Sequence, residues 1–379
     1  MMIPVILAAA VWQTWPFDGT RTLPGAVRPA GAREEVTVVT ARGVPAVFAA
    51  AIRADRAAKD VKPSAGTVKT ESGATFDAGA ASVRWVKCEA CDPNAWFTGE
   101  PGFGEKTLIP LRLVSGAAEV AKGETREFIF RLDIPKDAAP GLYRGKLVFS
   151  SAAGDLGEAP FALRIIPYVL GPAVTRNSDR ASLDGSKVFS GGEPALVSTE
   201  PTPYEILGAV PADWTRTGPG VYEKEAGTAK AVYTSGVRNP DKHAVRRWHA
   251  IGVRDYLEVC VPKALANPYV WRREAGVKAW TLGFDGAIAS AGADTLVGAA
   301  IEEAMTDARY LSAVSQLAHR LRYAGDYKLG LEGRIGTFFV DFADQSDASA
   351  PDADNLRLEV IATIDRFDAL LAGAKKEGK

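Results

Sequence analysis

The segment Glu127–Phe149, EFIFRLDIPKDAAPGLYRGKLVF, decides the structural class of the first half of this chain. Its first eight residues largely alternate between apolar and charged side chains, which is the pattern of a β-strand with one buried face. Pro140-Gly141 then indicates a turn, and Leu142–Phe149 follows as the partner strand. The segment therefore predicts a pair of strands, and the buried face of the first consists of Phe128, Phe130, Leu132 and Ile134.

Short strand-like runs continue on both sides of this pair, with Gly, Pro, Asp and Ser between them. The region carries no convincing helical pattern. It therefore predicts an N-terminal antiparallel β-sandwich over residues 30–171. Further strands are expected at Glu35–Thr40, Val44–Ile52, Val83–Lys87, Leu108–Val114 and Phe161–Val169.

Residues 172–290 alternate short apolar runs with helical stretches, which is typical of βα units around a parallel sheet. A helical stretch is expected at His243–Ile251, and Glu193–Gly220 is rich in Pro, Thr and Gly and is expected to be a long loop. Buried strands are expected at Lys187–Gly191, Ala229–Thr234, Tyr256–Val261 and Gly276–Leu282.

Residues 291–379 read as a C-terminal helical segment. Apolar residues recur every three or four positions over Leu296–Tyr323 and again over Asp354–Leu371, which predicts two amphipathic helices. Arg334–Phe342, RIGTFFVDF, is expected to be one more strand between them. The fold class predicted for the whole chain is thus multidomain, β followed by α/β.

Composition excludes several classes of protein. The 379 residues are 47% hydrophobic, and 45 Lys+Arg against 46 Asp+Glu leave a net charge of -1, so a nucleic-acid partner is not expected. Three Cys and three His are too few for a metal-rich protein, and no metal or cofactor is expected. Cys88 and Cys91 form a C-x-x-C pair that is open to three interpretations: a local disulfide or inert thiols, a free pair, or a metal or redox site.

The N-terminus favours export. Ile3–Val11 is a short apolar run, and Ala8-Ala9-Ala10 resembles a signal-peptidase site, so residues 1–20 are a predicted signal segment and the protein is expected to be secreted or periplasmic. The first Lys or Arg is Arg21, and a buried first strand is therefore the alternative interpretation. No segment has the roughly 20 apolar residues of a membrane span.

Three blocks resemble a known group of proteins. Leu132–Phe149 with Phe161–Leu170 is similar to the last strands of the N-terminal sandwich in large bacterial glycoside-hydrolase-like proteins, namely glycoside hydrolase family 123 and the related domain-of-unknown-function family 4091. Val270–Ala287, VWRREAGVKAWTLGFDGA, resembles the end of their (β/α)8 barrel. Ile301–Leu317, IEEAMTDARYLSAVSQL, resembles the helix that follows it.

The resemblance implies a glycan ligand and, if the chain is active, a glycosidase. Family 123 enzymes are N-acetylgalactosaminidases in which the substrate's acetamido oxygen attacks the anomeric carbon, assisted by an adjacent Asp-Glu pair. This chain contains no Asp-Glu dipeptide, and Gly171–Ile288 spans 118 residues, about half of a complete barrel. We therefore expect a partial barrel with impaired catalysis; a non-catalytic extracellular carbohydrate-binding or structural protein is the alternative.

Two acids are candidates for catalysis. Asp285 follows the predicted strand Gly276–Leu282, and barrel active sites lie at the carboxyl ends of strands. Glu193 follows the predicted strand Lys187–Gly191 in the same way. A turn or capping acid and a loop charge are the respective structural alternatives.

Four residues near Asp285 are candidates for substrate binding. The rings of Trp280 and Trp271 could stack on a sugar, with a core position as the alternative for Trp280. The guanidinium groups of Arg272 and Arg273 could donate hydrogen bonds to sugar hydroxyl or carboxylate groups. The sequence indicates no oligomeric state.

Overall fold

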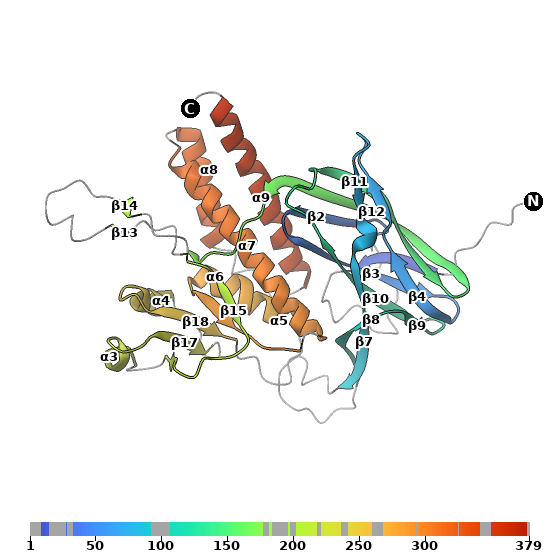
Figure 1. The fold of residues 1–379 in the computed structure, drawn as a ribbon, viewed down its shortest axis with the longest axis horizontal. Coiled ribbons are helices and arrows are strands. Elements are labelled where there is room, and N and C mark those ends of the chain that lie inside the picture. Colours follow the sequence, from blue (N-terminus) through green and yellow to red (C-terminus); the bar gives the residue numbers. More distant parts are fainter. Residues whose placement is uncertain are drawn as a thin grey trace, which may run out of the picture.

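The computed structural model describes residues 9–14, 28, 33–91, 107–176, 182–183, 196–197, 202–217, 221–235, 242–259, 268–292, 294–324, 326–341 and 350–376. In this part of the chain, two large sheets are followed by a curled half-barrel sheet and long C-terminal helices (Figure 1). The architecture is β plus α/β.

The two large sheets occupy the N-terminal half. The first has the order β1 (Ala9–Thr14), β3 (Pro45–Ala54), β10 (Thr125–Asp133), β7 (Ser82–Cys91) and β8 (Thr107–Ser115). The second has the order β2 (Val36–Arg42), β12 (Gly154–Val169), β11 (Gly141–Ser151), β4 (Ala58–Ser64) and β9 (Ala118–Val120). Beside this order, β5 (Thr67–Lys69) pairs with β11 and with β6 (Thr75–Asp77). A short 3-10 helix follows β6 at Ala78–Ala80.

Aromatic side chains of the two large sheets meet in one hydrophobic core. The ring of Phe48 in β3 stacks on Phe161 in β12 with centroids 5.2 Å apart. Phe128 in β10 meets Phe149 in β11 edge to face at 5.5 Å. The alternation predicted over Glu127–Ile134 is therefore real, because Phe128 and its alternate neighbours belong to this core.

Six sequence-predicted strands of this half overlap β2, β3, β7, β8, β11 and β12, and the strand predicted over Glu127–Ile134 overlaps β10. β1 pairs antiparallel with β3 and buries Trp12, which matches the alternative of a buried first strand for that part of the apolar run. Cys88 in β7 is free of any disulfide, and burial raises the pKa of its thiol to about 11.

The half-barrel is a five-stranded parallel sheet with the order β15 (Glu205–Leu207), β19 (Gly286–Ile288), β18 (Arg254–Glu258), β17 (Ala231–Ser235) and β16 (Thr215–Arg216). Its helices are α3 (Val221–Glu225), α4 (Lys242–His249), α5 (Pro268–Arg272) and α6 (Ala279–Leu282). A small separate hairpin joins β13 (Ser182–Leu183) to β14 (Leu196–Val197).

Two expectations for the half-barrel are wrong. Gly276–Leu282 is helical instead of a strand, because a π-helical segment at Arg273–Lys278 leads directly into α6. Gly276 lies so close to α7 (Leu296–Arg322) that a Cβ atom there would be 2.7 Å from the Ala304 carbonyl oxygen. The expected loop Glu193–Gly220 contains the short strands β14, β15 and β16. The expected strand Lys187–Gly191 lies outside the described residues.

Three long helices complete the structure: α7, α8 (Tyr327–Asp341) and α9 (Ala350–Lys376). The predicted helices Leu296–Tyr323 and Asp354–Leu371 match α7 and α9. The predicted strand Arg334–Phe342 is wrong, because its described residues lie in α8. Gly333 and Gly336 allow α8 to approach its neighbours: Cβ atoms there would be 2.4 Å from the Arg322 nitrogen and 2.5 Å from the Phe367 ring.

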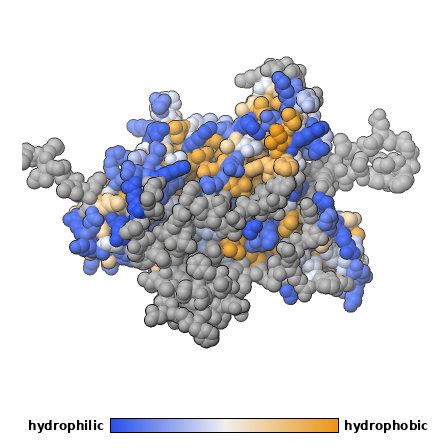
Figure 2. All heavy atoms as spheres, turned by 180° about the vertical axis from the view of Figure 1, so that it is seen from behind, coloured by the Kyte–Doolittle hydropathy of each residue, from blue (hydrophilic) through white to orange (hydrophobic). Residues whose placement is uncertain are grey.

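α7 joins the half-barrel to the two large sheets. The guanidinium of Arg309 donates hydrogen bonds to the carbonyl oxygens of Gly171 and Gly43 at 2.8 and 2.9 Å. The adjacent Tyr310 hydroxyl accepts one from the Ala41 nitrogen at 3.1 Å. Large apolar side chains are exposed along α8, and orange surface marks the projecting helices near the top of Figure 2.

Candidate functional site

The inner face of the half-barrel, the side turned away from its helices, gathers polar and aromatic side chains. Leu257 in β18 and Ala287 in β19 lie in the core with the helices, and Val232 in β17 packs against Trp248 of α4. Because side chains alternate along a strand, the neighbours of these residues point the other way. We define the inner face by Glu205, Trp214, Tyr233, Tyr256 and Glu258.

An aromatic pair occupies the middle of the inner face. The rings of Trp214 and Tyr256 have centroids 4.4 Å apart and are tilted by 42°. Trp214 is partly exposed, whereas Tyr256 is buried beneath it. Gly286 makes room for this pair, because a Cβ atom there would lie 2.8 Å from the Tyr256 ring and 2.2 Å from the Glu205 carbonyl oxygen.

Two carboxylates lie on the inner face at different heights. Glu205 opens β15 and accepts a hydrogen bond from the Tyr256 hydroxyl at 3.4 Å. Burial raises the pKa of Tyr256, and the Glu205 carboxylate raises it further, so the hydroxyl keeps its proton. Glu258 is the last residue of β18, at the carboxyl end where (β/α) barrels place their active sites. It is partly exposed.

A second acidic cluster lies on the helix side of the sheet. Asp285 directly precedes β19 and its Oδ2 is 2.8 Å from Nε2 of His249 in α4. The same oxygen accepts a hydrogen bond from the Asp255 backbone nitrogen at 2.9 Å. The Asp255 side chain is itself buried and accepts a 3.3 Å hydrogen bond from the Thr234 hydroxyl.

This cluster lies at the amino ends of the strands. The premise that placed Asp285 after a strand is wrong, because the preceding segment is helical and Asp285 comes before β19. Burial, and secondarily the charge of Asp285, raise the pKa of Asp255 well above its ordinary value, although the Thr234 hydroxyl opposes this. The raised pKa favours the protonated form of Asp255, and Asp285 beside it is only 6% exposed.

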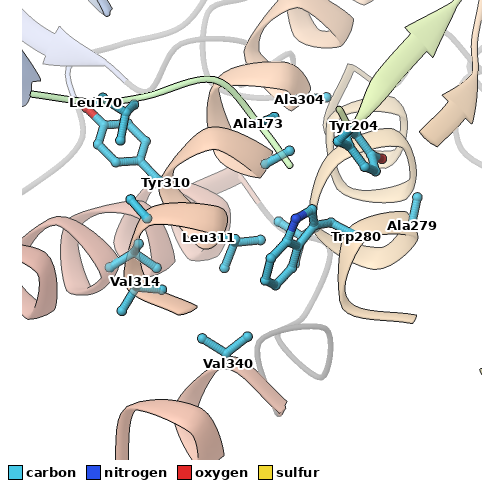
Figure 3. Packing of buried hydrophobic residues seen from close by; sticks show 14 of the residues in the cluster. Leu170, Ala173, Tyr204, Ala279, Trp280, Ala304, Tyr310, Leu311, Val314 and Val340 are labelled. Carbon is cyan, nitrogen blue, oxygen red and sulfur yellow. The ribbon is translucent and has the colours of Figure 1, made fainter. Parts of the chain in front are cut away.

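Trp280 lies in the hydrophobic core instead of on a surface. It is 0% exposed, and its indole nitrogen donates hydrogen bonds to the Val174 carbonyl oxygen at 2.7 Å and the Ser312 hydroxyl at 3.1 Å. Figure 3 shows its ring beside Leu311, between the helices and the segment that carries Ala173. Trp271 is partly buried against the same core. The structure therefore leaves no Trp280 ring face exposed to a sugar.

Arg272 is engaged in a buried ion-pair cluster. It is 1% exposed and its Nε and Nη1 atoms lie 2.7 Å from Asp307 Oδ2 and Asp354 Oδ1. Arg357 pairs with Asp307 at 2.6 Å and also with Glu303. Burial alone would raise the pKa of Asp307, but the two guanidinium groups hold it below the ordinary value. These contacts leave Arg272 no exposed atom for a ligand.

The remaining candidates lie apart from the inner face or beyond the described chain. The Arg273 guanidinium lies 3.7 Å from Glu274 in the π-helical segment. Glu193 lies outside the described residues. The described residues include no group of three His, Cys, Asp or Glu that could hold a metal ion, and no helix among them is long and apolar enough to cross a membrane.

Sequence reasoning missed the residues of the inner face. Glu258 lies inside the predicted strand Tyr256–Val261, whereas the observed strand β18 ends at Glu258, so no signal in the sequence placed this acid at a carboxyl end. Glu205 and Trp214 lie in the segment interpreted as a loop, where strands of two or three residues leave no periodic pattern.

Comparison with known proteins supports the fold. No protein-family model and no curated protein match the chain. The structure is similar to a family 123 glycoside hydrolase from Clostridium perfringens, which was analysed for the details of glycolipid glycan hydrolysis: the TM-score is 0.64 and 8% of residues are identical, over 97% of this chain and 99% of that one. The chain therefore has a family 123-like glycoside hydrolase fold.

Other likenesses are partial and carry no argument about function. A Niemann-Pick type C2 protein from the Japanese carpenter ant has a TM-score of 0.18 and 13% identity, over 34% of this chain and 78% of that one. A β-glucosidase from Listeria innocua, in complex with glucose, has a TM-score of 0.17 and 14% identity, over 43% and 16%.

Proposed function

We propose that this chain is a secreted or periplasmic glycoside-hydrolase-like protein that binds a glycan across the inner face of its half-barrel, and that its own hydrolytic activity is impaired. The observation that carries the proposal is the combination, on this one face, of the Trp214–Tyr256 pair with the carboxylates Glu205 and Glu258. The similarity to a solved glycoside hydrolase supports a glycan as the ligand class.

The chemistry of the inner face suits a sugar. An aromatic ring packs well against the apolar face of a pyranose, and Trp214 is the partly exposed member of the pair. Carboxylates accept hydrogen bonds from sugar hydroxyl groups, and such charge-assisted hydrogen bonds are stronger than neutral ones. Trp214 would thus provide the platform and Glu258 the polar anchor at its carboxyl end.

Impaired hydrolysis is proposed because the chain contains no Asp-Glu dipeptide, the acid pair that the resemblance to family 123 implies. Glu205 and Glu258 are on strands separated by β19 and differ by two residues in height. Two strand spacings and a two-residue rise place their Cα atoms roughly 12 Å apart. The carboxyl groups of glycosidases are about 5 to 9.5 Å apart, a separation that two Glu side chains can reach from Cα atoms at this distance. The missing Asp-Glu pair therefore carries the proposal of impairment. Asp285 and Glu193 stay predictions as catalytic acids.

Binding and hydrolysis are tested together. The purified protein is titrated with a panel of oligosaccharides that includes N-acetylgalactosamine-terminated glycans, and is assayed on aryl N-acetylhexosaminides and aryl hexosides. We expect saturable binding that Trp214→Ala and Glu258→Gln each weaken about tenfold or more, which is about 1.4 kcal/mol, with no more than trace turnover.

Two matched variants control for general effects. Tyr327→Ala removes an exposed aromatic on α8, and Glu223→Gln removes an exposed acid on α3, so neither should change glycan affinity. Turnover that Glu258→Gln abolishes would overturn the proposal of impairment and make the protein an active glycosidase. Absence of binding to every glycan would favour a structural role instead.

A further inference from the structure

α8 exposes an apolar stripe along its outer face. Tyr327 is 85% exposed and Phe338 is 65% exposed, and Leu331 and Ile335 between them are half-buried. The four residues follow one another at intervals of three or four, which places them on one face of an α-helix. We call this face the α8 stripe.

The opposite face of α8 is already buried. Gly333 lies against α7, Gly336 lies against the Phe367 ring of α9, and Val340 belongs to the hydrophobic core. A surface helix ordinarily carries polar and charged residues on the face turned away from the core. α8 is instead apolar along two opposite faces, so its outer face has the composition of a contact surface.

The order of side chains in the α8 stripe is the same in both directions along the helix. An aromatic residue stands at each end, Tyr327 and Phe338, and an aliphatic residue follows inside each of them, Leu331 and Ile335. A second copy of the helix, reversed about a twofold axis through the middle of the stripe, therefore presents an aromatic to each aromatic and an aliphatic to each aliphatic. A twofold contact requires a surface that is complementary to itself in this way.

We propose that the α8 stripe is a contact surface between two copies of this chain, which pack with their α8 helices antiparallel about a twofold axis. Tyr327 of one copy lies against Phe338 of the other, and Leu331 lies against Ile335 of the other. Because Tyr327 and Phe338 are about 16 Å apart along the helix axis, two aromatic pairs enclose a short aliphatic centre.

The exposed area of the stripe is sufficient for such a contact. An aromatic side chain buries about 150 to 250 Å² when it is covered, so the exposed parts of the four side chains amount to roughly 500 Å² in each copy. Two copies would together bury roughly 1,000 Å², which is the lower bound for a specific protein interface. Lys328 and Arg334 are exposed beside the stripe and would add to this area.

The charged groups beside the stripe are compatible with a second copy. Glu332 borders it on one side and lies 2.9 Å from the Arg366 guanidinium of α9, so its charge is compensated within the chain. Arg334 borders it on the other side, where its long side chain can extend to the Tyr327 ring of the second copy. A guanidinium packs favourably over such a ring. The contact is separate from the inner face of the half-barrel and independent of the proposed glycan function.

The test is sedimentation velocity of the full chain over a range of concentrations, with circular dichroism to verify that each variant is folded. We expect a monomer–dimer equilibrium. Tyr327→Ser and Phe338→Ser should each raise the dimer dissociation constant about tenfold or more, because each removes an aromatic from both ends of the contact. Leu142→Ser, which replaces an exposed apolar residue on β11, is the matched control and should leave the dissociation constant unchanged.

Cross-linking tests the antiparallel arrangement. Leu331→Cys places the new thiols of two copies close to the twofold axis, about 5 Å apart along the helices. Tyr327→Cys places them at opposite ends of the stripe, about 16 Å apart. A short bis-maleimide should therefore join two copies of the first variant far more than two copies of the second, above the background of the unaltered chain with its three Cys.

Three results would overturn the proposal. One is a chain that stays monomeric up to the highest concentration at which it is soluble, and another is a dimer that neither serine variant weakens. The third is cross-linking of Tyr327→Cys in preference to Leu331→Cys. A monomer that co-sediments with phosphatidylglycerol vesicles, and loses this in Phe338→Ser, would assign the stripe to a lipid surface in place of a second copy.

Discussion

Replacing Arg272 by methionine should destabilise the protein strongly, because the guanidinium is the centre of a buried charge cluster. Three hydrogen bonds are lost: two to Asp307, at 2.7 and 3.1 Å, and one to Asp354 at 2.7 Å. Methionine fills most of the volume, so the cost arises from the uncompensated carboxylates. Breaking a buried ion pair from one side costs about 3 to 5 kcal/mol.

The structure places the expected value near the middle of that range, about 4 kcal/mol. Asp307 keeps Arg357 as a partner, which limits the loss. Asp354 loses its Arg272 contact, while its other oxygen already has no described partner. Because a larger chain has a larger entropy of unfolding, each kcal/mol lowers the melting temperature by about 2 °C or less, so the melting temperature should fall by up to roughly 8 °C.

The assay is urea denaturation at neutral pH, monitored by circular dichroism, with Arg164→Met as the matched control. Arg164 pairs with Asp365 at 2.8 Å, but its side chain is 56% exposed, so its removal should cost less than about 1 kcal/mol. If Arg272→Met were no more destabilising than Arg164→Met, the reasoning that assigns Arg272 a structural role would be refuted.

Three further predictions follow from single residues. Gly286→Ala places a Cβ atom 2.2 Å from the Glu205 carbonyl oxygen, so it should lower the free energy of unfolding by about 1 to 3 kcal/mol or more. Gly208→Ala adds a Cβ atom in open space and should leave the melting temperature unchanged. Equal melting temperatures for the two variants would contradict this prediction. Burial raises the pKa of Asp255, so the folded chain keeps a proton that the unfolded chain releases above about pH 4. The free energy of unfolding therefore falls as the pH rises above about 4. Asp255→Asn should flatten that decline in urea titrations between about pH 4 and 7, and an unchanged slope would exclude the effect. Burial also raises the pKa of Cys88 to about 11, so little of the reactive thiolate is present at neutral pH. Peptide mapping should therefore find that iodoacetamide alkylates Cys88 more slowly in the folded chain than in the urea-unfolded chain. Equal rates in the two states would contradict this prediction.

Strands with one buried face were the most predictable part of the fold. The pattern over Glu127–Ile134 needs only local alternation, and the core that receives Phe128 is made by similar strands. The long helices α7 and α9 were predictable for the same reason, since their apolar stripes run over many turns. Local periodicity was sufficient for these elements.

Short elements and close helix packing were not predictable from local patterns. Arg334–Phe342 contains the aromatic and β-branched residues of a strand, yet most of it is helical because Gly333 and Gly336 let α8 pack closely on its neighbours. Trp280 reads as a sugar platform in sequence, but its place depends on contacts with Val174 and Ser312, which are distant along the chain.

The candidate site was only partly predictable. Asp285 was predicted as a catalytic acid at the carboxyl end of the strand Gly276–Leu282. That segment is helical, and Asp285 instead precedes β19. Glu205 and Glu258 come together through the parallel pairing of β15, β19 and β18, which joins segments about 50 residues apart. Such pairing leaves no trace in a single sequence.

The most direct test of the central claim is a crystal structure of the protein with an oligosaccharide that it binds. The account predicts a pyranose ring against Trp214 on the inner face of the half-barrel, with a hydroxyl group within hydrogen-bond distance of the Glu258 carboxylate. A sugar located elsewhere, such as beside Asp285 at the amino ends of the strands, with the inner face empty, would contradict it.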